Sequence, residues 1–524
     1  MFKNEVAEFI YKRTYSRWLE EEGRREDWPE TIERLIGFLI SKRPDIPEKT
    51  INKIRKYMTE FAVMPSMRFL WAAGPAAEFD NTCIYNCAFG KINTVEAFAE
   101  CLYVLMCGTG YGFSVEQEEV EKLPEVPEIK SGQGLPKVII KDSKAGWADS
   151  VKILMGSLYD GQNLYFDYSA IRLEGARLMT MGGRASGPAP LIKLHDFIRE
   201  TMHNAQGRKL TTLEAHDICN QIAEIVVVGG VRRSSQISLS DLDDKDMRHA
   251  KEWPFPIKRA MANNSAIFRE KPSAAQFLKE WASLALSGTG ERGIFNLSAA
   301  QSRAPSRRYA PLIQGTNPCG EIMLRDMEFC NLSEVVVRED DDLDSLLDKV
   351  ETATWLGVIQ STFTDFPYLR KEWKKNCDVE RLLGVSLTGQ MDNHSILTSE
   401  ALKALKSRVL RISRKAANIL GINVPVATTC VKPSGTVSQL VDSASGVHPR
   451  YSQYYIRRYR IAARDPLFMM MKDAGIKAHP ENGQTEEDAT TWVLEFPVKS
   501  PDGCMTRKDV SALDQLSHYK NLQH

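Results

Sequence analysis

The chain has 524 residues, and its 68 lysines and arginines are balanced by 68 aspartates and glutamates. This balance excludes the clustered basic excess with which proteins hold nucleic acid or an anionic membrane. No apolar run reaches the roughly 18 residues of a membrane-spanning helix, and the N-terminus is not apolar, so we expect a cytoplasmic protein. Ten cysteines in so long a chain indicate cytosolic thiols, some of them redox-active, and not a secreted disulfide scaffold.

In chain order, residues 1–62 show the periodicity of amphipathic helices and are predicted to form a helical N-terminal cap. From 63 to 524, short apolar runs alternate with helical patterns. This alternation favours parallel strands with helical crossovers, hence an α/β domain. The candidate strands are residues 138–140, 225–228, 385–387, 427–430 and 492–494, and the clearest candidate helices are 277–286 and 343–359.

The most informative stretch is Gln314-Gly-Thr-Asn-Pro-Cys-Gly-Glu-Ile322. In extended backbone the amide of Asn317, the thiol of Cys319 and the carboxylate of Glu321 would point the same way, because side chains alternate along a strand. Such a set suits hydrogen removal from a polyol. A turn with a buried cysteine is the alternative interpretation. A second thiol, Cys330 in Glu-Phe-Cys-Asn-Leu-Ser, favours the interpretation as a hydrogen-removing site over the interpretation as a turn.

Asn-Pro-Cys-Gly-Glu followed by Phe-Cys-Asn-Leu-Ser resembles the finger loop of ribonucleotide reductases. Further stretches resemble the adenosylcobalamin-dependent, monomeric (class II) kind, and they occur in the family's order. They are Arg13-Thr-Tyr-Ser-Arg-Trp18, Pro65-Ser-Met-Arg68, Met181-Gly-Gly-Arg-Ala-Ser-Gly-Pro188, Gly229-Gly-Val-Arg-Arg-Ser234, Pro433-Ser-Gly-Thr436 and Gly446-Val-His-Pro-Arg-Tyr451.

The resemblance implies a ten-stranded α/β barrel with the Cys319 loop threaded through its centre. It also implies reduction of ribonucleotides, as triphosphates, to 2′-deoxyribonucleotides by a thiyl radical that adenosylcobalamin initiates. A thioredoxin-type protein would act as reductant. The family's ATP-sensing module has no counterpart in the short N-terminal cap.

In the family's mechanism one thiol becomes the radical and two others end as a disulfide. By resemblance Cys319 takes the radical position and Cys330 is one reducing thiol. Its partner is Cys87 or, as the alternative, Cys83; the pattern Asn86-Cys87-Ala88-Phe89 favours Cys87. Glu321 fits the general base for the 3′-hydroxyl proton, and Asn317 would hold the hydroxyls, although it could instead close the turn before Pro318.

Other matching positions imply binding roles. Ser434, Gly435 and Thr436 offer hydroxyls and close backbone approach to substrate phosphates, and Ser66 resembles a second phosphate contact. Gly110, in Gly108-Thr-Gly-Tyr-Gly-Phe113, would lie beside the ribose. The resemblance also implies a specificity loop, through which a deoxynucleotide or ATP effector would act on the choice of substrate base. A loop that is merely mobile is the alternative interpretation. Its residues are Gly182, Gly183, Arg184, Ala185 and Ser186.

The cofactor contacts are the least defined. The chain lacks the Asp-x-His-x-x-Gly pattern that supplies a histidine to cobalt in other cobalamin proteins, so adenosylcobalamin would keep its own base. His448 and Pro449 are the candidate contacts. No protein-bound metal is predicted, since Cys83 and Cys87 are not followed by a second such pair.

Two other hypotheses compete with the cobalamin-dependent reductase. One is the large subunit of a metal-dependent (class I) reductase, and the other is a non-catalytic nucleotide-binding relative or fragment. Helical spacing from Val510 to Leu522 runs almost to the end of the chain, and the last cysteine is Cys504. We therefore expect that the family's last barrel strands and cysteine-pair tail are missing, and that a second polypeptide or splicing supplies them.

Overall fold

The computed structural model describes residues 2–130, 136–176, 178, 184–228, 235–463 and 465–523. The N-terminal segment is mainly helical, as predicted, with one short antiparallel ribbon. Aspartates and prolines begin its longer helices; Asp27 caps α2 in a reciprocal capping box. The elements are α1 (Glu5–Ile10), the π-helix η1 (Tyr11–Tyr15), β1 (Trp18–Leu19), β2 (Arg24–Arg25), α2 (Trp28–Lys42) and α3 (Glu48–Thr59).

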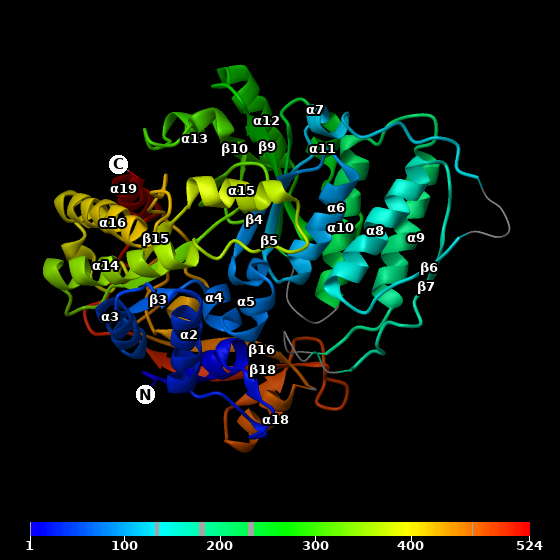
Figure 1. Ribbon diagram of the computed structural model, residues 1–524. Coiled ribbons are helices and arrows are strands. Elements are labelled where there is room, and N and C mark those ends of the chain that lie inside the picture. Colours follow the sequence, from blue (N-terminus) through cyan, green and yellow to red (C-terminus); the bar gives the residue numbers. More distant parts are fainter. Residues whose placement is uncertain are drawn as a thin grey trace.

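A six-stranded sheet lies at the centre of the molecule (Figure 1). Its strand order is β10-β9-β8-β5-β4-β13, with five parallel strands and a short antiparallel sixth. Helices cover it because each parallel connection needs a crossover. The strands are β4 (Cys87–Lys91), β5 (Gly110–Ser114), β8 (Gln236–Asp241), β9 (Ala262–Phe268), β10 (Gly293–Asn296) and β13 (Glu328–Phe329).

A second sheet has the strand order β15-β14-β3. Its strand β14 follows β13 after two intervening residues. Its strands β14 and β15 run parallel, β3 runs antiparallel, and Thr429 makes an isolated parallel bridge to Val385 of β15. In the described residues the two sheets are separate and do not form a closed ten-stranded barrel. The mixed α/β class is confirmed. The strands are β3 (Val63–Pro65), β14 (Leu332–Val336) and β15 (Gly384–Thr388).

Helices flank the sheets on two sides: α6, α8, α9 and α10 on the right in Figure 1, and α14 with α16 on the left. Residues 225–228, predicted as a strand, form the last turn of α10. Their β-branched run continues the helical spacing of buried Ile218 and Ile222, so packing overrides strand propensity. The helices are α6 (Val95–Met106), α8 (Lys144–Tyr159), α9 (Ala189–Asn204), α10 (Thr212–Val228), α12 (Ala274–Leu286), α14 (Leu343–Gln360), α15 (Lys371–Glu380) and α16 (Ser399–Ile419).

A three-stranded antiparallel sheet, β16-β18-β17, packs against α1, where Phe9 contacts the rings of Tyr459 and Phe496. The N-terminal cap therefore shares its hydrophobic core with segments from the far end of the chain. The elements from 436 onward are α17 (Thr436–Leu440), β16 (Tyr454–Ala462), α18 (Pro466–Asp473), β17 (Ala478–Pro480), β18 (Thr491–Lys499) and α19 (Ala512–Gln523).

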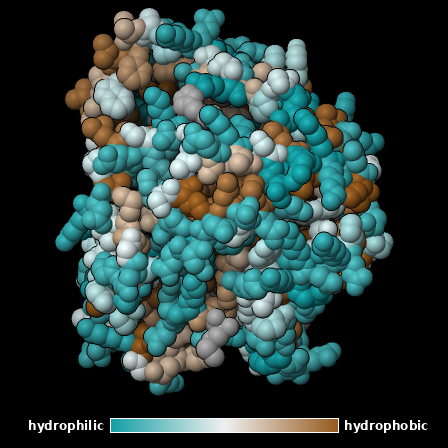
Figure 2. Space-filling model, turned by 90° about the vertical axis from the view of Figure 1, so that its left-hand side faces the viewer, coloured by the Kyte–Doolittle hydropathy of each residue, from teal (hydrophilic) through white to brown (hydrophobic). Residues whose placement is uncertain are grey.

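The remaining elements are short, and no helix in the described ranges is both long and apolar enough to span a bilayer. The left-hand face is largely polar, with separate apolar patches (Figure 2). The short elements are α4 (Met67–Ala72), α5 (Pro75–Phe79), η2 (Asn81–Ile84), α7 (Gln117–Val120), β6 (Lys137–Ile139), β7 (Tyr165–Asp167), α11 (Lys245–His249), η3 (Ile257–Met261), α13 (Leu297–Ser302), η4 (Ala310–Leu312), β11 (Gly315–Thr316), β12 (Met323–Leu324) and η5 (His394–Ile396).

Candidate active site

The Cys319 stretch is a β-hairpin whose strands are β11 and β12. Its tip is a turn closed by a hydrogen bond from the Gly320 N–H to the Asn317 carbonyl at 2.9 Å. Gly320 has φ +81°, a conformation that glycine adopts without strain. The backbone is thus turned and not extended, which corrects the alternation argument for residues 317–321. The turn instead leaves the Cys319 side chain exposed at the tip.

Asn317 and Glu321 face each other across this turn. The Asn317 side-chain N–H donates to Glu321 Oε2 at 2.8 Å, and its Oδ1 accepts from the Ile322 N–H at 3.0 Å. Asn317 therefore both closes the turn and contacts the carboxylate. Burial raises the pKa of Glu321 above its usual value, and the Asn317 hydrogen bond and the Lys432 charge oppose that rise.

Glycines of β5 let the hairpin approach the central sheet. A Cβ on Gly112 would lie 2.2 Å from the Thr316 carbonyl oxygen. A Cβ on Gly110 would lie 3.2 Å from Pro318 Cγ and 3.3 Å from Cys87 Sγ. Pro318 at the hairpin tip and the Cys87 thiol therefore both lie next to the position that a side chain on Gly110 would occupy, which brings these two features close together.

Cys87 and Cys330 occupy opposing positions of an antiparallel pair. Strands β4 and β13 are in register through Ala88 and Phe329, and the Cys330 N–H donates to the Cys87 carbonyl at 2.9 Å. Opposing residues of such pairs have Cα atoms about 4.5–5.5 Å apart, within the range that a disulfide can bridge. Burial, followed by the hydrogen bond with Cys87, raises the pKa of Cys330, so this thiol stays protonated at neutral pH.

Cys83, the alternative partner, lies in a different environment. It belongs to η2, and its Sγ donates to the Asp80 carbonyl at 3.1 Å. Burial raises the pKa of Cys83 to about 11. The Asp80 carboxylate also accepts from Tyr103 and from Cys107, at 2.7 and 3.4 Å. Cys83 is therefore part of a buried polar cluster around Asp80.

Sequence reasoning did not single out Lys432 and Glu334. Lys432 donates to Glu334 Oε2 at 2.7 Å, and both side chains are buried. The Lys432 charge acts on Glu321 and on Cys430, whose pKa is raised by burial. The only available signal was the position of Lys432 immediately before Pro433-Ser-Gly-Thr436.

The candidate phosphate-binding residues meet from three parts of the chain. Thr436 Oγ1 shares a 3.0 Å hydrogen bond with the Tyr15 hydroxyl and donates to Met67 Sδ at 3.2 Å. Ser66, next to Met67, caps α4 by accepting from the Phe69 N–H at 3.1 Å. Gly435 has φ +62°. Ser434 Oγ is buried and has no hydrogen-bond partner among the described residues.

The Gly446–Arg450 segment runs beside this turn, since a Cβ on Gly446 would lie 2.9 Å from the Lys432 carbonyl oxygen. His448 is exposed, and its ring donates to the Ser445 carbonyl at 3.3 Å. Pro449 follows it on the same segment.

Of the candidate specificity loop, Arg184, Ala185 and Ser186 are described, and Gly182 and Gly183 lie outside the described residues. Arg184 donates to the Gly175 carbonyl at 3.0 Å, and Ala185 exchanges backbone hydrogen bonds with Gly175 and Ala176. An open cavity of about 330 Å³ adjoins this segment. It is lined by Glu174, Ser186, Ala189, Pro190, Lys193, Glu224 and Ile225.

Comparisons with known proteins find ribonucleotide reductases. The family model "Ribonucleotide reductase alpha domain" matches residues 1–75. An adenosylcobalamin-dependent ribonucleoside-triphosphate reductase of Lactobacillus delbrueckii subsp. bulgaricus is 29% identical, over 94% of this chain and 79% of the relative. A crystal structure of a B-12-dependent (class II) ribonucleotide reductase superposes with a TM-score of 0.82 at 26% identity, covering 98% of this chain and 84% of that one.

A more distant structure shows the fold alone. The class Id ribonucleotide reductase alpha subunit of Actinobacillus ureae is 14% identical and superposes with a TM-score of 0.54, over 90% of this chain and 79% of that one.

Proposed function

Because the chain is a homologue of the adenosylcobalamin-dependent class II ribonucleotide reductases, we propose that it reduces ribonucleoside triphosphates to 2′-deoxyribonucleotides by a thiyl-radical mechanism. The observation that carries the proposal is the position of Gly110. Pro318 at the hairpin tip and the Cys87 thiol, which lies opposite Cys330, both approach the side-chain position of this residue, which has no side chain. A ribose bound there could meet the radical thiol and the reducing pair together.

In this mechanism the residues of the site have the following roles. Cys319, as a thiyl radical, removes the 3′-hydrogen of the ribose, and Glu321 accepts the proton of the 3′-hydroxyl. Asn317 orients the Glu321 carboxylate by its 2.8 Å hydrogen bond. Cys87 and Cys330 give two protons and two electrons, the 2′-hydroxyl leaves as water, and the pair ends as a disulfide. Cys319 then returns its hydrogen to the 3′ carbon, which re-forms the thiyl radical. The raised pKa of Cys330 suits it to hold the proton that this departure needs.

Adenosylcobalamin would supply the initiating radical. The arrangement fits such a group in two respects: the Cys319 side chain is exposed at the hairpin tip, and the exposed His448 lies on a segment that runs beside the phosphate turn. His448 and Pro449 would contact the cofactor. We also propose that the two separate sheets correspond to the two halves of the family's barrel.

The same homology supports proposals for the effector site and for the reductant. We propose that a deoxynucleotide or ATP effector binds near the Arg184–Ser186 segment, where the adjoining cavity offers Lys193 to a phosphate. A thioredoxin-type protein would re-reduce the Cys87–Cys330 disulfide.

The test is a reductase assay with adenosylcobalamin, a ribonucleoside triphosphate and a small dithiol. We expect deoxynucleotide formation that depends on adenosylcobalamin. Cys319→Ser should abolish both product and hydrogen exchange between cofactor and solvent, whereas Cys330→Ser should keep the exchange and block product. Activity without adenosylcobalamin but with an iron or manganese partner subunit would support a class I reductase, and nucleotide binding without product would indicate a non-catalytic relative.

A further inference from the structure

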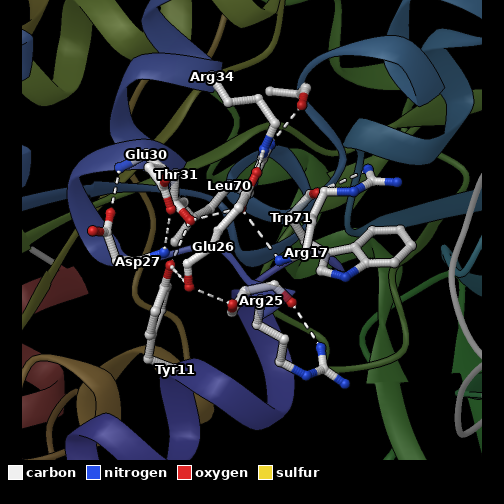
Figure 3. Close-up of polar contacts among 12 residues, drawn as sticks. Tyr11, Arg17, Arg25, Glu26, Asp27, Glu30, Thr31, Arg34, Leu70 and Trp71 are labelled. Atoms are coloured by element: carbon white, nitrogen blue, oxygen red, sulfur yellow. Dashed lines mark hydrogen bonds and ion pairs between the residues drawn. The ribbon is translucent and has the colours of Figure 1, made fainter. Parts of the chain in front are cut away.

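One turn of π-helix, η1, carries two buried tyrosines whose hydroxyls have different partners. Tyr11 donates to the Glu26 carbonyl at 3.1 Å and shares a 2.8 Å hydrogen bond with Thr31 (Figure 3). Tyr15, four residues later, bonds instead to Thr436 of the phosphate turn. Single π-turns are uncommon and occur often at functional sites.

The segment that carries Tyr15 is fixed by a buried charge cluster around Glu26. The Glu26 carboxylate accepts from the Arg17 N–H at 3.2 Å, from Thr31 at 2.8 Å and from Arg34 at 2.6 Å. Arg34 also donates to the Leu70 carbonyl of α4 at 3.3 Å (Figure 3). The N-terminal segment and the helix that Ser66 caps are thus held as one unit, which leaves the Tyr15 hydroxyl in a defined place.

The two hydroxyl groups of the phosphate turn, on Ser434 and Thr436, lack strong hydrogen-bond acceptors. Thr436 donates to the thioether sulfur of Met67, a weak acceptor. Ser434, only 6% exposed, has no partner for its hydroxyl within the described part of the chain. A buried hydroxyl left unpaired costs about 1–3 kcal/mol. Phosphate oxygens are strong acceptors that would satisfy both hydroxyls.

Two arginines are sequence neighbours of Tyr15 and Met67, although the phosphate turn itself has only hydroxyls and glycine. The guanidinium groups of Arg17 and Arg68 lie over one ring, that of Trp71, at 5.2 and 4.7 Å from its centre. Arg17 is two residues from Tyr15, and Arg68 follows Met67. Both guanidinium groups donate to backbone carbonyls, Arg17 to that of Trp71 and Arg68 to that of Cys107, so we assign neither of them to the phosphate.

We propose that Tyr15 of the N-terminal cap is a positioning residue of the substrate-phosphate site. Its hydroxyl donates to Thr436, so that the Thr436 hydroxyl keeps its own proton for a phosphate oxygen of the nucleoside triphosphate beside Ser434. The proposal rests on the proposed function for the identity of its ligand. It makes the N-terminal cap a part of the binding site, and not only a support for it.

Two matched variants of the full chain test this role. Tyr15→Phe and Tyr11→Phe each remove one buried hydroxyl from the same π-turn, but only Tyr15 contacts the phosphate turn. Titration calorimetry with a ribonucleoside triphosphate, and with inorganic tripolyphosphate as a probe without ribose or base, should show about three- to tenfold weaker binding for Tyr15→Phe. Tyr11→Phe should bind both ligands like the unaltered protein. In turnover, Tyr15→Phe should raise KM by the same factor and leave kcat within about twofold.

A double-mutant cycle with Thr436→Val identifies the route of the effect. If Tyr15 acts through Thr436, Tyr15→Phe causes no further loss of tripolyphosphate binding once Thr436 is valine. Additive losses, equal effects of the two tyrosine variants, or unchanged binding in Tyr15→Phe would each overturn the proposal. Failure of the unaltered chain to bind any nucleoside triphosphate would overturn the proposed function as well. Binding without reduction would overturn that function alone and leave the tyrosine comparison valid.

Discussion

At the scale of single residues, the site depends on how one carboxylate is held. Glu321 is buried, which favours its protonated form, while the Asn317 amide and the Lys432 ammonium favour the ionised form. A general base must be ionised to accept a proton. The proposed mechanism therefore requires these two neighbours to offset part of the effect of burial.

The pH dependence of catalysis tests this balance. Activity should fall as pH drops through the pKa of Glu321, which lies above the usual range for glutamate. Asn317→Ala removes a hydrogen bond that the ionised form accepts, so the pKa rises further and the acid limb of kcat/KM moves to higher pH. Gln314→Ala is the control, because that amide bonds to the Pro311 carbonyl on the same hairpin. An acid limb that stays in place in Asn317→Ala would contradict the assignment of Glu321 as base.

For single residues, a local pattern carried information about the reducing pair, whose role stays a prediction. The motif Asn-Cys-Ala-Phe pointed to Cys87, and the structure places Cys87, and not Cys83, opposite Cys330. Tyr15 and Glu334 could not be found in this way. Their partners, Thr436 and Lys432, are separated from them by 421 and 98 residues, and no local pattern encodes such a contact.

At the scale of elements, the hairpin β11–β12 and strand β5 fit together because β5 alternates glycine with larger residues. Gly110 and Gly112 face the hairpin, while Tyr111 and Phe113 point into the buried core. Alternation of this kind follows from the two-residue period of a strand. Close backbone approach here positions Cys319 more firmly than its exposed turn could alone.

Gly112→Ala should therefore displace the hairpin, since the new Cβ would meet the Thr316 carbonyl oxygen, a backbone atom that cannot rotate away. We expect a loss of about 10²-fold in kcat, as for a shift of about 1 Å in a catalytic group. Gly156→Ala, in the last turn of α8 with open space around the new methyl group, should raise the free energy of unfolding by up to about 1 kcal/mol and leave kcat unchanged. Full activity in Gly112→Ala would show that the hairpin does not need this contact.

Element prediction failed where tertiary packing decides the outcome. Helices 277–286 and 343–359 were predictable from their spacing and correspond to α12 and α14. The run at 225–228 has the composition of a strand but ends helix α10, because its predecessors already pack with helical period. Residues 427–430, predicted as a strand, run parallel to the start of β15 and share three backbone hydrogen bonds with residues 383–385, although only Thr429 forms a bridge there. Periodicity also could not show that the strands divide into separate sheets, since it contains no pairing information.

At the scale of the whole molecule, the site is assembled from segments at both ends of the chain. Residues 15, 66–67 and 434–436 meet at the phosphate turn, and strands β4, β5 and β13 meet at the thiols. The order of the family motifs along the chain indicated a common site. No single motif could do so, because each short pattern alone is compatible with an ordinary turn. The N-terminal cap and the last sheet share one hydrophobic core, which holds these segments together.

The most direct test of the central claim is a single turnover without external reductant. The prereduced full-length protein is mixed with adenosylcobalamin and a ribonucleoside triphosphate, and peptide mapping then locates any disulfide while product is counted. The account predicts about one deoxynucleotide per chain, with one disulfide that joins Cys87 to Cys330, as their opposed positions allow. Product accompanied by a disulfide that includes Cys83, or the absence of product from a protein that binds both ligands, would contradict it.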